Sequence, residues 1–279
     1  MDATLRTDAG RCVLRLERAL AHPPEKVWRA ITEPGHLEHW FPARLDGQQR
    51  AGERITFTFP DSDGGAGTIT DYDPPRLFAF TWEDETLRFE VRPTPEGSLL
   101  VLTQHFDDRP AAASYAAGWE TCLGALEDIL DGNPIAPRDW AAANDKYAAQ
   151  FGLLRGTAEP DGDRWRVHFE RQLTAPADEV WPHLADLAHG TLTTDQPPTT
   201  RHVRLDNGDD VRFDLGPGPG GARLTLTHNG ITEDRLVTTL AHWHSAIRDL
   251  TRDLTGTTPG APDADLDTYY RHTIGATLP

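Results

Sequence analysis

Hydrophobic residues recur with two different periods along the first half of the chain. Ile55, Phe57 and Phe59 alternate with polar residues, which is the pattern of a strand with one buried face. From residue 115 onward the apolar residues recur every three or four positions, which predicts a long amphipathic helix. Gly132 and Pro134 then end that helix.

The same patterns give an order of elements for the first 132 residues. Pro24 is placed to begin a short helix, and Pro34 and Gly35 end it. A second helical turn follows at 36–41. We expect strands at 12–21, about 52–59, 67–73, 76–83, 86–93 and 98–106, followed by the long helix.

The second half of the chain repeats parts of the first. ERALAHPPEKVW at 17–28 matches ERQLTAPADEVW at 170–181, with an offset of 153 residues. LRFEV at 87–91 matches VRFDL at 211–215 with an offset of 124. The second copy is therefore shorter by 29 residues, lost between Trp181 and Val211, and we expect it to lack the two strands equivalent to about 52–73. Pro182 should also distort its short helix.

The repeat predicts two domains, residues 1–156 and 164–279, joined by the polar segment TAEPDGD at 157–163. A length of 279 residues suits two domains rather than one. The first is expected to be a complete module with a short C-terminal helix, DKYAAQFG. The second is expected to be a reduced module, whose terminal DTYYRHTIG is a similar helix with an inward tyrosine.

Charge and composition narrow the function classes. The formal net charge is −17 and the basic residues are scattered, so nucleic acid and anionic membrane surfaces are poor partners. No apolar run approaches the 18 residues of a membrane span and no signal peptide is recognisable, so we expect a cytoplasmic protein. The sequence makes no prediction of oligomeric state.

Several motifs of the first half resemble those of one known superfamily. The matching strings are PPEKVWRAIT (23–32), HLEHWFPA (36–43), GERITF (52–57), PPRLFAFTW (74–82), LLVLTQHF (99–106) and GWETCLGALEDIL (118–130). Together they resemble the SRPBCC or START-like superfamily, and within it the activator of heat shock protein 90 ATPase homologue family. The resemblance implies an α+β helix-grip fold, in which a curved antiparallel sheet wraps around the long C-terminal helix. The fold is expected twice, with a degenerate second copy.

That resemblance also places a ligand cavity between sheet and helix. Gln104 is the best polar candidate within it; the family commonly has histidine at this place, and the second copy has His228. The alternative is that the aromatic residues simply fill the core. The candidate lining residues are Trp40, Phe41, Phe57, Phe59, Phe80, Trp82, Leu102, Gln104, Phe106, Tyr115 and Trp119.

Three functions remain open at this point. The first is binding of a hydrophobic small molecule, such as a lipid or an aromatic polyketide-like compound. The second is an aromatase or cyclase-type enzyme, for which only Gln104, His105 and Tyr115 offer polar groups. The third is a protein-interaction or co-chaperone-like role. We expect no cofactor and no metal, because His36 and His39 have helical spacing but no third ligand nearby in sequence.

Overall fold

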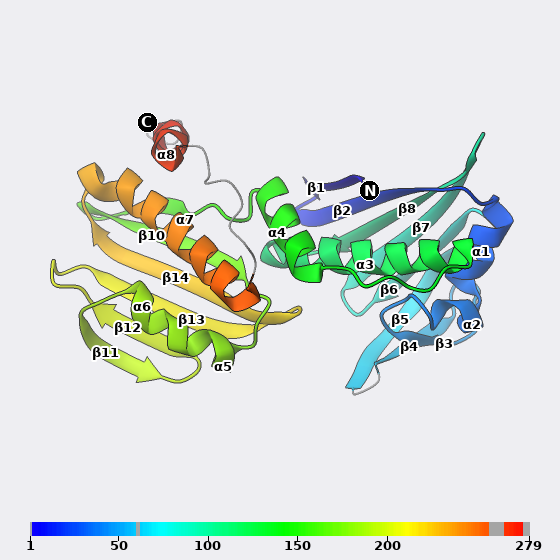
Figure 1. Ribbon diagram of the computed structural model, residues 1–279, viewed down its shortest axis with the longest axis horizontal. Coiled ribbons are helices and arrows are strands. Elements are labelled where there is room, and N and C mark those ends of the chain that lie inside the picture. Colours follow the sequence, from blue (N-terminus) through cyan, green and yellow to red (C-terminus); the bar gives the residue numbers. More distant parts are fainter. Residues whose placement is uncertain (1, 60–61, 257–264, 276–279) are drawn as a thin grey trace. The chain divides into compact units, whose positions relative to one another are not determined.

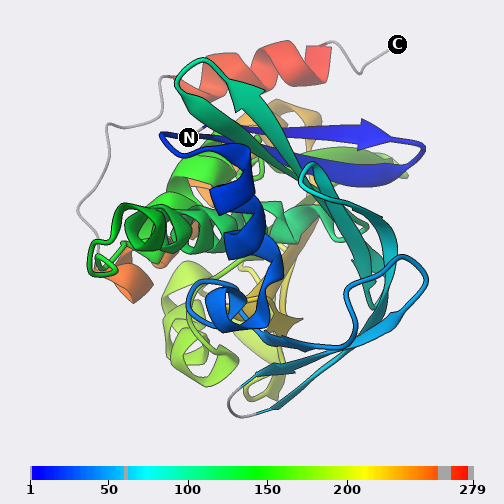
Figure 2. The same cartoon turned by 90° about the vertical axis from the view of Figure 1, so that its right-hand side faces the viewer.

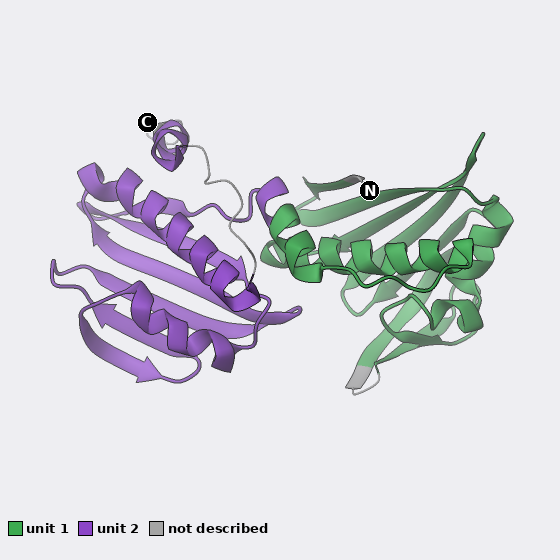
Figure 3. Cartoon of the chain, in the orientation of Figure 1, with its two compact units in different colours: residues 1–147 green, residues 148–279 purple. Residues whose placement is uncertain are grey.

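The protein consists of two compact units, residues 1–147 and 148–279 (Figure 3). The computed structural model describes residues 2–59, 62–256 and 265–275. Each unit contains one antiparallel sheet and a long helix lying across it (Figure 1). The predicted α+β class, with a helix-grip arrangement in both halves of the chain, is confirmed.

In the described residues, the first sheet has eight strands in the order β1-β2-β8-β7-β6-β5-β4-β3. Figure 2, in which the first unit faces the viewer, shows the sheet twisting between β1–β2 and β4–β5. The strands are β1 (Asp2–Asp8), β2 (Arg11–Leu20), β3 (Arg44–Asp46), β4 (Arg54–Phe59), β5 (Ser62–Asp73), β6 (Leu77–Trp82), β7 (Glu85–Thr94) and β8 (Gly97–Phe106).

Two of these strands were not expected from the sequence. β1 pairs with β2 through a tight turn at Ala9 and Gly10, both at positive φ. β3 is three residues long and pairs with β4. Both are mostly polar or short, so neither shows the alternation from which strands are predicted. In addition, β5 begins at Ser62, five residues before the expected start.

The helices of the first unit follow the predicted order. α1 (Pro24–Thr32) and α2 (Pro34–Leu37) precede β3, and the short 3₁₀ helix η1 (Arg109–Ala111) leads into α3 (Ala112–Asp131). α3 ends where predicted, because Gly132 adopts φ +74° and Asn133 donates its backbone N–H to the Asp128 carbonyl. α4 (Trp140–Gln150) follows, and the division between the units falls within it.

The core of the first unit lies between α3 and the concave face of the sheet. Leu16 and Leu102 are neighbours in the register of β2 and β8, and both are fully buried. Leu123 and Leu126 on α3 are buried as well, at the three-residue spacing that brings side chains to one face of a helix. These contacts fix the position of α3, which carries several residues of the site described below.

The second unit has six strands in its described residues, in the order β11-β12-β13-β14-β10-β9. Its elements are β9 (Thr157–Asp161), β10 (Arg164–Gln172), α5 (Ala177–Val180), η2 (Trp181–His183), α6 (Leu184–Leu187), β11 (Thr191–Gln196), β12 (Thr200–Arg204), β13 (Asp210–Gly218), β14 (Gly221–Ile231), α7 (Glu233–Thr255) and α8 (Leu266–Gly275). The helix equivalent to α1 is interrupted by a 3₁₀ turn at Pro182, as predicted.

The two sheets share one strand register. Leu14 and Leu87 flank Gln104 in the first sheet, and Val167 and Val211 flank His228 in the second. These pairs keep the offsets of 153 and 124 residues found in the sequence. In the second sheet, β9, β10, β14 and β13 therefore occupy the places of β1, β2, β8 and β7 in the first.

Two predictions about the second unit were wrong in detail. The segment 157–163 is not a linker: Thr157–Asp161 form β9, which pairs with β10 across a tight turn at Gly162. β11 occupies the place of β5, and a Pro-Pro pair follows each of them, at 74–75 and 197–198. Among the described residues of the second sheet the missing strands are thus the equivalents of β3 and β4, rather than β4 and β5.

Each unit also packs a tyrosine from a short following helix against its long helix. Tyr147 on α4 is buried and donates its hydroxyl hydrogen to Glu120 on α3. Tyr270 on α8 is buried, and its hydroxyl lies 2.9 Å from Nδ1 of His244 on α7. The predicted inward tyrosines are confirmed. No helix in the described part of the chain is long and apolar enough to cross a membrane.

Candidate functional site

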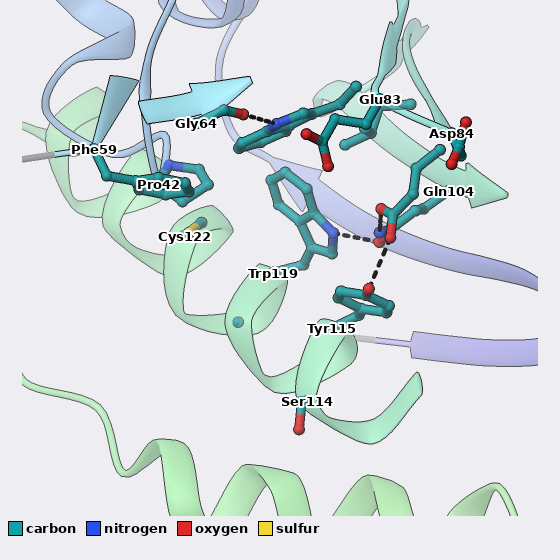
Figure 4. Close-up of a pocket in the computed structure, with 14 residues that line it drawn as sticks. Pro42, Phe59, Gly64, Glu83, Asp84, Gln104, Ser114, Tyr115, Trp119 and Cys122 are labelled. Carbon is teal, nitrogen blue, oxygen red and sulfur yellow. Dashed lines mark hydrogen bonds between the residues drawn. The ribbon is translucent and has the colours of Figure 1, made fainter. Parts of the chain in front are cut away.

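A pocket of about 590 Å³ lies in the first unit between α3 and the ends of β6 and β7. Its walls come from the β4–β5 hairpin, the β6–β7 turn, β8 and α3 (Figure 4). The lining residues are Pro42, Phe59, Gly64, Trp82, Glu83, Asp84, Glu85, Leu87, Gln104, Ser114, Tyr115, Gly118, Trp119 and Cys122. This volume is in the range of small-molecule sites.

One wall of the pocket is an immobilised indole. Trp82 stacks on Phe57 with ring centroids 4.2 Å apart and on Phe59 at 5.9 Å. Its Nε1 donates a 2.6 Å hydrogen bond to the backbone carbonyl of Gly64. Phe41 stacks on the same indole at 5.8 Å. Stacking on three rings and a hydrogen bond to the main chain hold the indole in one orientation, so this wall is formed before any ligand arrives.

The glycines of the segment 64–67 allow the backbone of β5 to lie close to the neighbouring strands. A Cβ added to Gly67 would lie 1.7 Å from the backbone oxygen of Thr81 on β6, which no side chain could tolerate. A Cβ on Gly64 would lie 2.9 Å from the backbone oxygen of Phe57. These positions therefore require glycine, because the backbone of β5 lies against its neighbours beside the pocket.

The opposite wall carries a chain of hydrogen bonds that ends on a carboxylate (Figure 4). Trp119 donates its indole N–H to Oε1 of Gln104 at 2.7 Å, and Nε2 of Gln104 donates to Oε2 of Glu85 at 2.6 Å. The hydroxyl of Tyr115 donates to Oε1 of Glu85 at 2.7 Å. Both ends of the Gln104 amide are thus engaged, which fixes its orientation and places the Glu85 carboxylate at the pocket.

All charged residues that line the pocket are acidic. Glu83, Asp84 and Glu85 follow one another through the β6–β7 turn, and no lysine, arginine or histidine is among the lining residues. Glu83 adopts φ +52°, a left-handed conformation that is uncommon for residues other than glycine. Such backbone conformations concentrate at functional sites. The pocket therefore combines apolar walls with a negative edge.

Cys122 contributes a neutral surface rather than a nucleophile. Burial raises the pKa of its thiol to about 12, so the side chain is protonated at neutral pH. Nucleophilic attack by cysteine requires the thiolate. Cys122 therefore acts as part of the apolar wall.

Five of the eleven predicted lining residues lie at the pocket, and six do not. Those at the pocket are Phe59, Trp82, Gln104, Tyr115 and Trp119. The other six are buried and lie outside the pocket lining: Trp40, Phe41, Phe57, Phe80, Leu102 and Phe106. Neighbouring rings surround these side chains; Phe80, for example, packs against Phe41, Phe57, Phe78 and Phe89.

Sequence reasoning missed the acidic residues of the turn. The turn between β6 and β7 contains Glu83, Asp84 and Glu85. In a turn, strand alternation does not predict which way a side chain points. A signal was nevertheless present, because Asp209 stands 124 residues after Glu85, at the same offset that relates Gln104 to His228. The repeat could therefore have identified this carboxylate.

His105, one of three residues that a cyclase mechanism would need, does not line the pocket. It follows Gln104 on β8 and so points to the opposite face of the sheet. There, burial and the charges of Arg11 and Arg6 lower the pKa of its imidazole. The site thus retains Gln104 and Tyr115, and both bind Glu85.

The second unit contains the same chain of hydrogen bonds, but there it is buried and ends on a salt bridge. Trp243 donates its indole N–H to Nδ1 of His228 at 2.9 Å, and Nε2 of His228 lies 3.2 Å from Oδ2 of Asp209. Arg235 forms a salt bridge with the same Asp209 oxygen. His228 and Asp209 are each only 4% exposed.

These contacts define the ionisation of both groups. Because Nδ1 of His228 accepts the indole hydrogen, Nε2 carries the only ring proton and donates it to Asp209. Burial holds the pKa of His228 below its ordinary value, against the opposing effect of Asp209. Burial also raises the pKa of Asp209, but hydrogen bonds from Arg235 and His228 outweigh it and lower the pKa overall. His228 is therefore neutral and Asp209 ionised.

Residues 21–131 match the family described as activator of Hsp90 ATPase homolog 1-like protein. The matched residues lie within the first unit and contain the motifs quoted above. No curated protein matches the chain with significant similarity. Within residues 2–59, 62–256 and 265–275, no group of three or more histidine, cysteine or acidic residues could hold a metal ion.

Several solved structures resemble about half of the chain. A conserved protein of unknown function from Enterococcus faecalis, EF2215, is 21% identical with a TM-score of 0.48, covering 53% of this chain and 89% of its own. CalU16 from Micromonospora echinospora is 22% identical with a TM-score of 0.42, covering 53% and 96%. Protein MLL2253 from Mesorhizobium loti is 28% identical with a TM-score of 0.40, covering 44% and 98%.

Proposed function

We propose that the first unit binds an apolar or aromatic small molecule in the pocket beside α3. The observation that carries this proposal is the 590 Å³ pocket itself, with Phe59, Trp82, Tyr115 and Trp119 in its walls. An indole stacked on three rings and a carboxylate held by two hydrogen bonds form a site that needs little rearrangement to accept a ligand.

Binding is favoured over catalysis by the chemistry of the lining. The Cys122 thiol is protonated at neutral pH because burial raises its pKa to about 12. Gln104 and Tyr115 both donate hydrogen bonds to Glu85, and His105 lies on the other face of the sheet. Of the three polar residues named for a cyclase mechanism, two are thus held by Glu85 and the third is outside the pocket.

Gly118 offers a direct test of the pocket. It lines the pocket from α3, and a Cβ built on it would meet no atom within 4 Å, so a large side chain there enters open space. We expect Gly118→Phe to fold normally and to abolish binding of a neutral environment-sensitive dye, Nile red, measured by fluorescence titration of the full chain.

Gly35→Phe is the matched control. Gly35 is exposed in α2, and its added Cβ would also meet nothing within 4 Å. Wild type and this control should bind the dye with equal affinity. Equal binding by the folded Gly118→Phe variant would remove the support for a ligand in this pocket, as would the absence of dye binding by the wild type.

A further inference from the structure

We propose that the ligand of this pocket carries a positive charge, which pairs with the carboxylate of Glu85. The inference rests on the proposed function, since it specifies the ligand class for the same pocket. Both units place a carboxylate at the same point of the same chain of hydrogen bonds. In the second unit an arginine forms a salt bridge with it, and in the first unit no described side chain does.

The two chains of hydrogen bonds correspond residue by residue. An indole donates to an acceptor on β8 or β14: Trp119 to Gln104, or Trp243 to His228. The same β-strand side chain then donates to a carboxylate at the beginning of the neighbouring strand, Glu85 or Asp209. All three positions are related by an offset of 124 residues.

The second unit supplies a cation to its carboxylate from its own chain. Arg235, in the first turn of α7, forms a salt bridge with Asp209. The residue 124 positions earlier is Ala111, which is fully buried before α3 and has no charge to offer. The first unit thus retains the carboxylate while lacking the cation that accompanies it in the second.

No protein cation replaces Arg235 in the first unit. Among the described residues, none forms a salt bridge with Glu85, whose side chain accepts hydrogen bonds from Gln104 and Tyr115. Arg11 is near the turn, but its guanidinium donates to the carboxylate of Asp107 and the backbone oxygen of Asp84. In the described part of the chain, the Glu85 carboxylate therefore has no cationic side chain paired with it.

The apolar walls suit a cation as well. Trp82 and Trp119 line the pocket, and the faces of aromatic rings attract ammonium and guanidinium groups. A negative charge on one side and aromatic rings on the others favour an organic cation with an apolar body. An organic anion of the same shape would be repelled by Glu83, Asp84 and Glu85.

Three probes with one ring system test the charge. Isothermal titration of the full chain would compare naphthylmethylammonium, naphthylmethanol and naphthoate at pH 7 and fixed ionic strength. We expect the ammonium compound to bind at least about tenfold more tightly than the alcohol, and naphthoate to bind more weakly than either. Equal or tighter binding of the alcohol would overturn the proposed charge preference while leaving the pocket as an apolar site. Failure of all three probes would count against the proposed function itself.

A matched pair of variants assigns the preference to one residue. Glu85→Gln removes one of the three negative charges that line the pocket, and Glu96→Gln makes the same change at an exposed position in the turn after β7. We expect the ammonium preference to disappear in Glu85→Gln and to persist in Glu96→Gln, with circular dichroism confirming that both fold. A preference that persists in Glu85→Gln would refute the role of this carboxylate, and the wild-type comparison decides the charge class even if that variant does not fold.

Discussion

Replacing His228 by glutamine should remove an acid sensitivity from the second unit without removing its hydrogen bonds. Gln104 already makes the equivalent bonds in the first unit, with Oε1 accepting from an indole and Nε2 donating to a carboxylate. Glutamine at 228 can therefore accept from Trp243 and donate to Asp209 in the same way. We expect His228→Gln to unfold within about 1 kcal/mol of the wild type at pH 7.5.

The magnitude of the pH effect follows from linkage. The pKa of His228 lies below its ordinary value of 6.5 in the folded state, so the unfolded chain binds a proton that the folded chain does not. Stability from this group is complete above pH 6.5 and is lost as the pH falls below it. The loss is at most about 1.4 kcal/mol per pH unit, or about 2 kcal/mol between pH 7 and pH 5. A second proton would also set two N–H donors, His228 and Trp243, against each other.

The free energy of unfolding of the second unit can be measured by urea titration with pulsed hydrogen exchange, using peptides from residues 221–255. The difference between wild type and His228→Gln cancels the contributions of other histidines. The lowered pKa of Asp209 acts in the same direction, but only at lower pH, below the window used here. Equal losses of stability in wild type and His228→Gln between pH 7 and pH 5 would refute the reasoning.

Two further substitutions test the construction of the pocket. Gly67→Ala should destabilise the first unit by more than about 2 kcal/mol in urea unfolding, because its Cβ would lie 1.7 Å from a backbone oxygen; an unchanged Gly67→Ala would mean that β5 and β6 separate freely. Gly216→Ala on β13, whose Cβ would meet nothing within 4 Å, should not destabilise the second unit, to which it belongs. Tyr115→Phe should reduce the free energy of unfolding by about 1 kcal/mol by removing the hydroxyl donor to Glu85, and no change would show that this hydrogen bond is replaced by water.

The internal repeat was the most informative property of the sequence. The offsets of 153 and 124 residues predicted the two sheets, and the structure preserves them in the strand register around Gln104 and His228. The identity of the lost strands was misjudged because the Pro-Pro pairs at 74–75 and 197–198 were not aligned with each other. Local pattern also failed for β1 and β3, because each buries one apolar side chain, Ala3 or Leu45, which is too few to show an alternation.

The site was predictable only in part. Alternation correctly brought Phe59, Trp82 and Gln104 to the pocket, since these residues lie on strands whose two faces are distinguishable. It could not separate them from Phe57 and Phe80, because rings on the same face either line a space or fill it according to how their neighbours pack. That distinction depends on volumes contributed by distant segments.

The sequence by itself determined most of the strands, both long helices and the occurrence of the arrangement twice, whereas β1, β3 and β9 were not recognisable in it. These properties follow from the short-range periodicity of hydrophobic residues and from matching sequence strings, both of which are local features of the chain. Tertiary structure alone decided that Glu85 joins Gln104 and Tyr115, and that Arg235 balances Asp209 while Ala111 leaves its counterpart without a cation. Charge balance around a carboxylate is set by distances of a few ångströms between residues far apart in sequence, and only folding fixes those distances.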